Sequence, residues 1–73
     1  MRVKIEASSD SWLRPNNTIE KYPYLNEYGY EDGYINIDTL DEVQDLVYYI
    51  GLPLIIFNTE DGWVFEIYDD YRE

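Results

Sequence analysis

The segment TLDEVQDLVYYIG, Thr39 to Gly51, carries the clearest local structural signal in the chain. Thr39 followed three residues later by Glu42 forms a capping box, in which each side chain bonds a backbone N–H of the other residue. Gly51 suits the left-handed position just after a helix, and Pro53 blocks any continuation. Between these ends, apolar residues recur at helical spacing, namely Leu40, Val43, Leu46, Val47 and Ile50. The segment therefore predicts an amphipathic helix over residues 40–50 with one apolar stripe.

Strand patterns lie on both sides of this helix. Residues 2–7 and 34–38 alternate between apolar and polar side chains, which is the period of a half-buried strand. The run Leu54–Phe57 is apolar throughout and predicts a central strand that is buried on both faces or nearly so. A turn at 59–62 separates it from residues 63–68, which alternate again, with one side formed by Trp63, Phe65 and Ile67. The last two runs therefore predict a β-hairpin.

The length and the order of these elements define the expected fold. The chain has 73 residues, which suffices for a single domain, 1–73, with one small core. The predicted order is strand, long connection, strand, helix, strand and strand. This order indicates an α+β fold, in which a small, mostly antiparallel sheet has one helix packed on one face. The other face must then be polar, or residues 12–33 or a partner must cover it.

The connection between the first two strands, residues 8–33, is unusually rich in aromatic and acidic residues. It contains most of the stretch KYPYLNEYGYEDGY, Lys21 to Tyr34, which holds five tyrosines and three carboxylates. This composition is too apolar for a disordered segment. Two local structures remain open, a short strand at 18–22 or a helical turn at 24–28. So many half-polar rings in a connection suggest a recognition surface, because tyrosine gives a large, rigid contact area.

Charge is the strongest global property of the sequence. Sixteen acidic residues against five basic residues give a net charge of −11. This charge disfavours direct contact with nucleic acid or with an anionic membrane, because phosphates would be repelled. It favours a basic partner, and in particular a nucleic-acid-binding protein. The alternative is that the acidic residues serve only solubility.

Several classes of site are excluded or disfavoured by composition. The chain has no cysteine and no histidine, which excludes a disulfide framework and a thiolate or imidazole zinc site. We expect no cofactor, because no P-loop, dinucleotide or EF-hand pattern occurs. We also expect no enzymatic activity, because no nucleophile has an evident base. The N-terminal residues lack the apolar region of a signal peptide, so we expect a cytoplasmic protein.

The candidate contact residues combine carboxylates with tyrosines. Acids near a helix start, in turns or in a tail each have an ordinary structural explanation, but together they make a dense negative charge. An arginine of a partner can stack on a tyrosine ring while it pairs with a neighbouring acid. Tyr48 and Tyr49 are consecutive, so at least one of them should be exposed. The predicted partner-binding residues are Glu27, Tyr28, Tyr30, Glu31, Asp32, Asp41, Asp45, Tyr49, Asp69 and Asp70.

The whole-chain composition and the acidic run EIYDDYRE, Glu66 to Glu73, are similar to those of a known group of small proteins. The chain resembles small acidic phage-encoded anti-defence proteins, anti-CRISPR proteins and DNA mimics among them. The resemblance implies a non-enzymatic inhibitor that acts in the host cytoplasm and presents carboxylates where DNA phosphates would lie. No functional residue carries over by position, and the acids here do not form one long helical ladder.

Two other functions fit the same sequence. One is a structural or assembly role, in which a homo-oligomer uses an uncovered sheet face or an edge strand. The other is an antitoxin-like neutraliser of a basic toxin. We therefore expect either a monomer or a small homo-oligomer.

Overall fold

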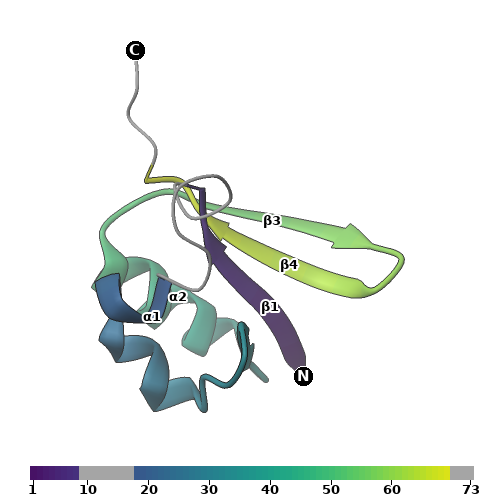
Figure 1. The fold of residues 1–73 in the computed structure, drawn as a ribbon. Helices are drawn as coiled ribbons and strands as arrows, with labels where there is room; N and C mark the ends of the chain where they lie inside the picture. The colour runs from purple at the N-terminus through teal and green to yellow at the C-terminus, as the bar shows by residue number, and fades with distance from the viewer. Residues whose placement is uncertain (9–17, 70–73) are drawn as a thin grey trace.

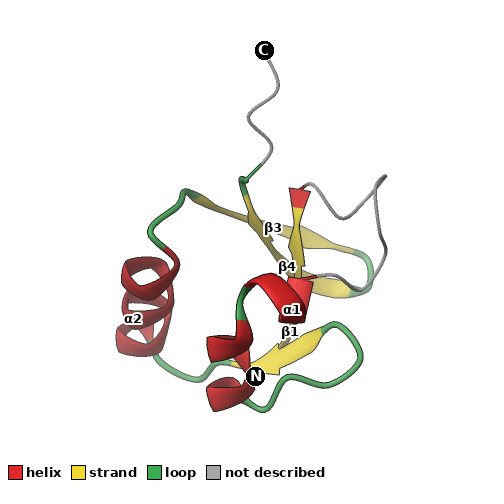
Figure 2. Cartoon of the chain, turned by 60° about the vertical axis from the view of Figure 1, so that its left-hand side comes forward, coloured by secondary structure: helices red, strands yellow, loops and turns green. Residues whose placement is uncertain are grey.

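The computed structural model describes residues 1–8 and 18–69 and has an α+β architecture, as predicted (Figure 1). A four-stranded sheet is accompanied by helical segments that gather on one side of it (Figure 2). In chain order the elements are β1 (Arg2–Ala7), α1 (Thr18–Lys21), the 3₁₀ helix η2 (Pro23–Tyr28), β2 (Tyr34–Asn36), α2 (Leu40–Ile50), β3 (Leu54–Thr59) and β4 (Gly62–Ile67).

The strand order is β2-β1-β4-β3, so the first and last strands form the centre of the sheet. β1 pairs with β2 in the antiparallel sense, and β3 pairs with β4 in the antiparallel sense, which confirms the predicted hairpin. The central pair is parallel, with Ile5 opposite Phe65 and Ala7 opposite Ile67. A parallel pair needs a long crossover connection, and the segment that carries the helices provides it. The sheet is therefore mixed, with two of its three pairings antiparallel.

One hydrophobic cluster joins the sheet to the helices. The alternation of β1 turns Val3, Ile5 and Ala7 to the same face, where all three are buried. Leu25 of η2 and Leu46 of α2 belong to the same cluster and have no exposed surface. Both helices therefore cover the same face of the sheet, and the described residues of the connection do not cover the opposite face.

The ends of α2 form as the sequence predicts. The Thr39 hydroxyl accepts a hydrogen bond from the Glu42 N–H at 3.2 Å, and the Glu42 carboxylate accepts one from the Thr39 N–H at 3.2 Å. Gly51 adopts the left-handed conformation with φ of 73°, and its N–H donates to the Val47 carbonyl at 2.9 Å. A side chain at position 51 would be strained in this conformation, so glycine is the favoured residue there.

The apolar stripe of α2 is narrower than the sequence predicts. Leu46 is buried, and Val43 and Ile50 pack against the core. Leu40 is 85% exposed and Val47 is 37% exposed, so the outer members of the predicted stripe lie beside the core rather than in it. Residues of η2 and α1, including Leu25 and Ile19, share the apolar face of the sheet with α2, so only three residues of α2 reach the core.

The described part of the connection is helical in Thr18–Lys21 and Pro23–Tyr28 and ends in a turn at residues 29–33. Thr18–Lys21 is a single turn of α-helix, so the alternative of a strand at 18–22 is wrong, while the helical turn at 24–28 is confirmed within η2. Pro23 occupies the start of η2, where its missing N–H costs no hydrogen bond. The buried Thr18 hydroxyl accepts a hydrogen bond from the Ala7 N–H at 3.0 Å, which ties α1 to the end of β1.

The prediction that Leu54–Phe57 is a central, doubly buried strand is wrong. β3 lies at the edge of the sheet, where Ile55, Ile56 and Phe57 are 44%, 45% and 40% exposed. Trp63, which was expected on the core side with Phe65, is 42% exposed. The reason is geometric, because the hairpin extends away from the helices and beyond their cover (Figure 1).

We expect Leu46→Ala to lower the free energy of unfolding by about 2–5 kcal/mol, because it opens a cavity where α2 meets the sheet. Leu40→Ala in the same helix is the matched control, and its effect should stay within about 0.5 kcal/mol because Leu40 is exposed. Urea unfolding followed by circular dichroism measures both values. Equal effects would contradict the assignment of Leu46 to the core.

Candidate functional site

The exposed side of α2 carries acids and tyrosines together. Asp41, Asp45 and Tyr48 follow one another at intervals of four and three residues, so they lie in one row along the helix. Tyr48 is 88% exposed and Tyr49 is 55% exposed, which confirms that this tyrosine pair is not hidden. α2 contains no basic residue, so its carboxylates have no cationic neighbour within the helix.

Tyrosines attach η2 to α2. The ring of Tyr24 stacks on the ring of Tyr49 with centroids 3.8 Å apart and planes 14° apart. Tyr24 also meets Tyr28 edge to face, with centroids 5.7 Å apart. The Tyr28 hydroxyl donates a hydrogen bond to the Glu42 carbonyl at 3.5 Å. These contacts hold the two helical segments against each other, so their outer residues form one surface.

The position of Tyr28 between the two segments changes its acidity. Burial, followed by hydrogen bonding with Tyr24 and the negative charges of Asp45 and Glu42, raises the pKa of Tyr28 to about 12. A phenolate at this position would lose its hydration and would lie close to two carboxylates. Tyr28 therefore stays neutral at physiological pH, and its role is to hold η2 against α2.

Glu27 extends this surface onto η2. Residues three apart in a 3₁₀ helix share one side, so Glu27 lies on the side of Tyr24, and the buried Leu25 lies on the side of Tyr28. The outward residues of the two segments define the α2–η2 surface, which consists of Tyr24, Glu27, Asp41, Asp45, Tyr48 and Tyr49. Within residues 1–8 and 18–69, none of its three carboxylates forms an ion pair.

Other predicted contact residues lie on the turn between η2 and β2. The backbones of Glu31 and Tyr34 bond each other in both directions, at 2.9 and 3.0 Å, and Asp32 has a left-handed φ of 54°. Both carboxylates of this turn are exposed, whereas Tyr30 packs partly against the core. No hydrogen bond or ion pair among the described residues joins Glu31 or Asp32 to α2. The turn is a second acidic area and not part of the α2–η2 surface.

Asp69 takes part in a network inside the molecule. Its carboxylate accepts hydrogen bonds from the Tyr22 hydroxyl at 2.8 Å and from the Ser8 hydroxyl at 3.2 Å, and it pairs with the Lys21 ammonium at 3.5 Å. The side chain is only 6% exposed. This network, the Asp69 network, joins the ends of β1, α1 and β4, so the carboxylate has a structural use. Asp70 lies outside the described residues.

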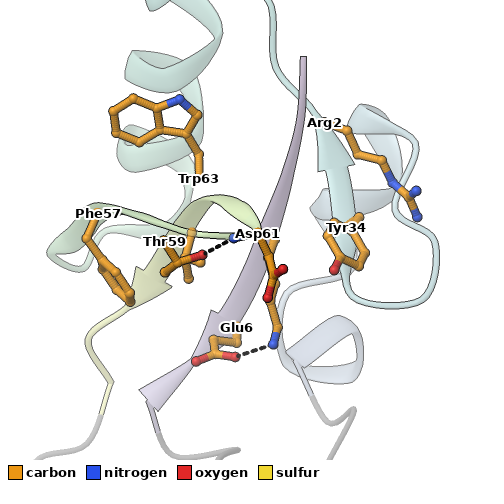
Figure 3. A pocket seen from close by; sticks show the side chains of 9 residues that line it. Arg2, Glu6, Tyr34, Phe57, Thr59, Asp61 and Trp63 are labelled. Carbon is orange, nitrogen blue, oxygen red and sulfur yellow. Dashed lines mark hydrogen bonds and ion pairs between the residues drawn. The ribbon is translucent and has the colours of Figure 1, made fainter.

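The sheet face opposite the helices contains a hollow of about 320 Å³ that the sequence did not indicate. The Arg2 guanidinium lies 4.3 Å from the ring centre of Tyr34, and the Lys4 ammonium lies 3.8 Å from the Glu6 carboxylate (Figure 3). Lys4 of β1 and Val64 of β4 are register partners, and both line this hollow. Its lining has both signs of charge, and each of its two cations already has a partner within the hollow.

Of the predicted contact residues, the structure brings Tyr28, Asp45 and Tyr49 together where α2 and η2 join, because Tyr28 and Tyr49 both contact Tyr24 and Asp45 helps to raise the pKa of Tyr28. Glu27 and Asp41 lie on the exposed sides of the same two segments. Tyr24 and Tyr48 belong to the same surface and were not among the predicted residues. Tyr48 could have been predicted from the sequence, because it follows Asp41 and Asp45 at helical spacing. Tyr24 could not, because its position depends on the path of η2, which the sequence did not determine.

Comparisons with protein-family models, with curated proteins and with solved structures find no match to this chain. Across the part of the chain that the structure describes, no helix is long and apolar enough to span a bilayer. Within the same ranges, no three acidic side chains are grouped in a way that suits a metal ion.

We expect the phenol of Tyr28 to make stability fall at alkaline pH. Its pKa is raised from 10.0 to about 12 in the folded chain, so its contribution is complete below pH 10 and is lost as the pH rises toward 12. Tyr28→Phe should therefore lose less unfolding free energy over this range than the wild type. Urea unfolding at several alkaline pH values measures the difference, and Tyr48→Phe, at an exposed position, should behave like the wild type. Parallel pH profiles for wild type and Tyr28→Phe would contradict this position of the phenol.

We expect Asp69→Ala to lower the free energy of unfolding by about 1–3 kcal/mol, because it leaves the Tyr22 hydroxyl without its acceptor in a half-buried place. Glu60→Ala, at the exposed tip of the hairpin, removes a carboxylate of similar size and should change stability by less than about 0.5 kcal/mol. Thermal unfolding of the two variants checks the comparison. An Asp69→Ala variant as stable as the wild type would contradict a structural role for the Asp69 network.

Proposed function

We propose that this protein is a non-enzymatic acidic binding protein that uses the α2–η2 surface to engage a basic partner, and that the partner handles nucleic acid. One observation carries the proposal. The carboxylates Glu27, Asp41 and Asp45 are exposed beside tyrosines, and among the described residues they form no ion pair.

The unpaired acids favour association with a cation-rich surface. Asp41 lies in the first turn of α2, where the helix dipole stabilises it, but it remains exposed to solvent. The chain carries a net charge of −11, so its field extends well beyond the surface at low ionic strength. Such a field steers a basic partner and speeds its association, and salt weakens the effect.

The tyrosines supply contact area that charge alone does not give. Tyr49 is held in place by its stack on Tyr24, so little side-chain freedom remains to be lost on binding. A guanidinium group of a partner can stack on Tyr48 or Tyr49 and pair with Asp45 at the same time. This combination favours arginine-rich surfaces over lysine-rich ones.

A nucleic-acid-binding partner fits this chemistry best. Duplex DNA carries one charge per roughly 1.7 Å of axis, and a groove built to receive it is lined with lysine and arginine. A small body with an acidic, tyrosine-bearing surface competes for such a groove. The compositional resemblance to phage-encoded anti-defence proteins supports the same function, with the host cytoplasm as its site.

The test is capture of partners from a host lysate on immobilised protein, at low and at raised salt. We expect the wild type to retain nucleic-acid-binding proteins, and we expect salt or added duplex DNA to release them. Neutralisation of the surface by Asp41→Asn with Asp45→Asn should weaken binding of a captured protein by about tenfold, or about 1.4 kcal/mol.

The matched control removes the same charge elsewhere. Glu60→Gln with Asp61→Asn neutralises two exposed acids at the tip of the hairpin and should leave the affinity nearly unchanged. Equal losses for the two double variants would show that total charge, and not the α2–η2 surface, determines binding. Binding that does not respond to salt or DNA would rule out the electrostatic mechanism.

A further inference from the structure

β3 forms a free edge of the sheet with unpaired backbone groups. The Tyr68 N–H donates to the Pro53 carbonyl at 2.9 Å, and this bond fixes which residues of β3 face β4. Because inward and outward groups alternate along a strand, Leu54, Ile56 and Asn58 direct their N–H and C=O groups outward. Among the described residues, no hydrogen bond reaches these outward groups.

Within the part of the chain that the structure describes, this edge has none of the usual protections against strand pairing. Natural edge strands are commonly short, charged or covered. β3 has six residues, LIIFNT, and none of them is charged. Its side chains are exposed on both faces, with Ile55 and Ile56 at 44% and 45%. The opposite edge, β2, has only three residues, so it gives little room for pairing.

The uncharged edge allows a second copy of this chain to pair with β3. Two copies of a chain with a net charge of −11 repel each other where their carboxylates face, but β3 presents no carboxylate. An antiparallel pair of identical strands is also self-complementary about a twofold axis. We propose that two copies of this chain pair antiparallel along β3, with Ile56 opposite the Ile56 of the second copy, and so form a dimer with one continuous sheet.

This register satisfies every outward group of the strand. With Ile56 on the axis, Leu54 faces the second copy's Asn58, and each such pair exchanges two backbone hydrogen bonds. Phe57 lines the hollow (Figure 3). On the same face of the sheet, Ile55 lies opposite the second copy's Phe57, so two exposed apolar side chains meet across the axis. The acids of the hairpin tip lie beyond the paired residues. The assembly closes at two copies because only the short β2 edges remain.

Salt separates this dimer from the proposed function. The dimer brings two negative chains together, so added salt should screen their repulsion and strengthen the dimer. Added salt should have the opposite effect on the binding of a basic partner and weaken it. Sedimentation equilibrium over a range of protein concentrations, at low and at raised salt, measures the first effect. We expect a monomer–dimer equilibrium that shifts toward the dimer as salt rises.

Substitution at the axis tests the interface. Ile56→Lys places two lysines directly opposite each other and should raise the dimer dissociation constant by about tenfold or more. Tyr48→Lys makes the same charge change on exposed α2 and should not weaken the dimer. Asn58→Pro, which removes an outward N–H but no bond to β4, should act like Ile56→Lys. Circular dichroism confirms that each variant keeps its fold.

A mixing experiment tests the register. Ile56→Lys and Ile56→Glu chains should each dimerise poorly alone and form a mixed dimer together, because opposite charges then face across the axis. A chain that stays monomeric in both salts, at all concentrations, would overturn the proposal and leave the edge for a strand of another protein. A dimer that tolerates Ile56→Lys, or variants that fail to form the mixed dimer, would overturn it as well.

Discussion

The parallel pairing of β1 with β4 is the constraint on which the rest of this structure depends. It places Ile5 opposite Phe65 and Ala7 opposite Ile67, and these four side chains form the apolar floor that both helices cover. The same pairing forces β3 to the outside of the sheet, and both of its strands line the hollow on the opposite face. The described helices cover one face only, so Ile55 and Phe57 on the second face, and the β3 edge, stay exposed among the described residues.

The tyrosines link this framework to the surface and have two separate uses. Tyr28 is neutral and half-buried, and it serves to fasten η2 to α2. Tyr48 and Tyr49 are exposed and offer contact area beside Asp45. The acids divide in the same way, because Asp69 is enclosed by the Asp69 network while Asp41 and Asp45 face solvent. Composition alone gives all of these residues the same appearance, and only the packing separates them.

The sequence predicted the features that depend on neighbouring residues. The capping box, the glycine at the end of α2 and the β3–β4 hairpin all follow from short spacings, and all are confirmed. The prediction of a buried central strand from the apolar run Leu54–Phe57 is wrong, because hydrophobicity indicates a preference for burial but not whether other elements reach the strand. The stack of Tyr24 on Tyr49 was not predicted from the sequence, because it depends on a contact between segments that are distant along the chain. The predicted partner, the compartment and the absence of catalysis stay predictions.

The central strand pair also limits when the chain can fold. Lys4 and Val64 are register partners, and nearly the whole described chain lies between them. During synthesis, β1 is made long before β4, and until β4 exists β1 can pair only with β2 and its inner face can meet only the helices and β2. Folding that rests on such a distant contact is slow to begin and cannot be completed piece by piece. Until β4 is made, the core lacks Phe65 and Ile67, so Ile5 and Ala7 stay incompletely covered, and in that interval the nascent chain is open to chaperones and proteases.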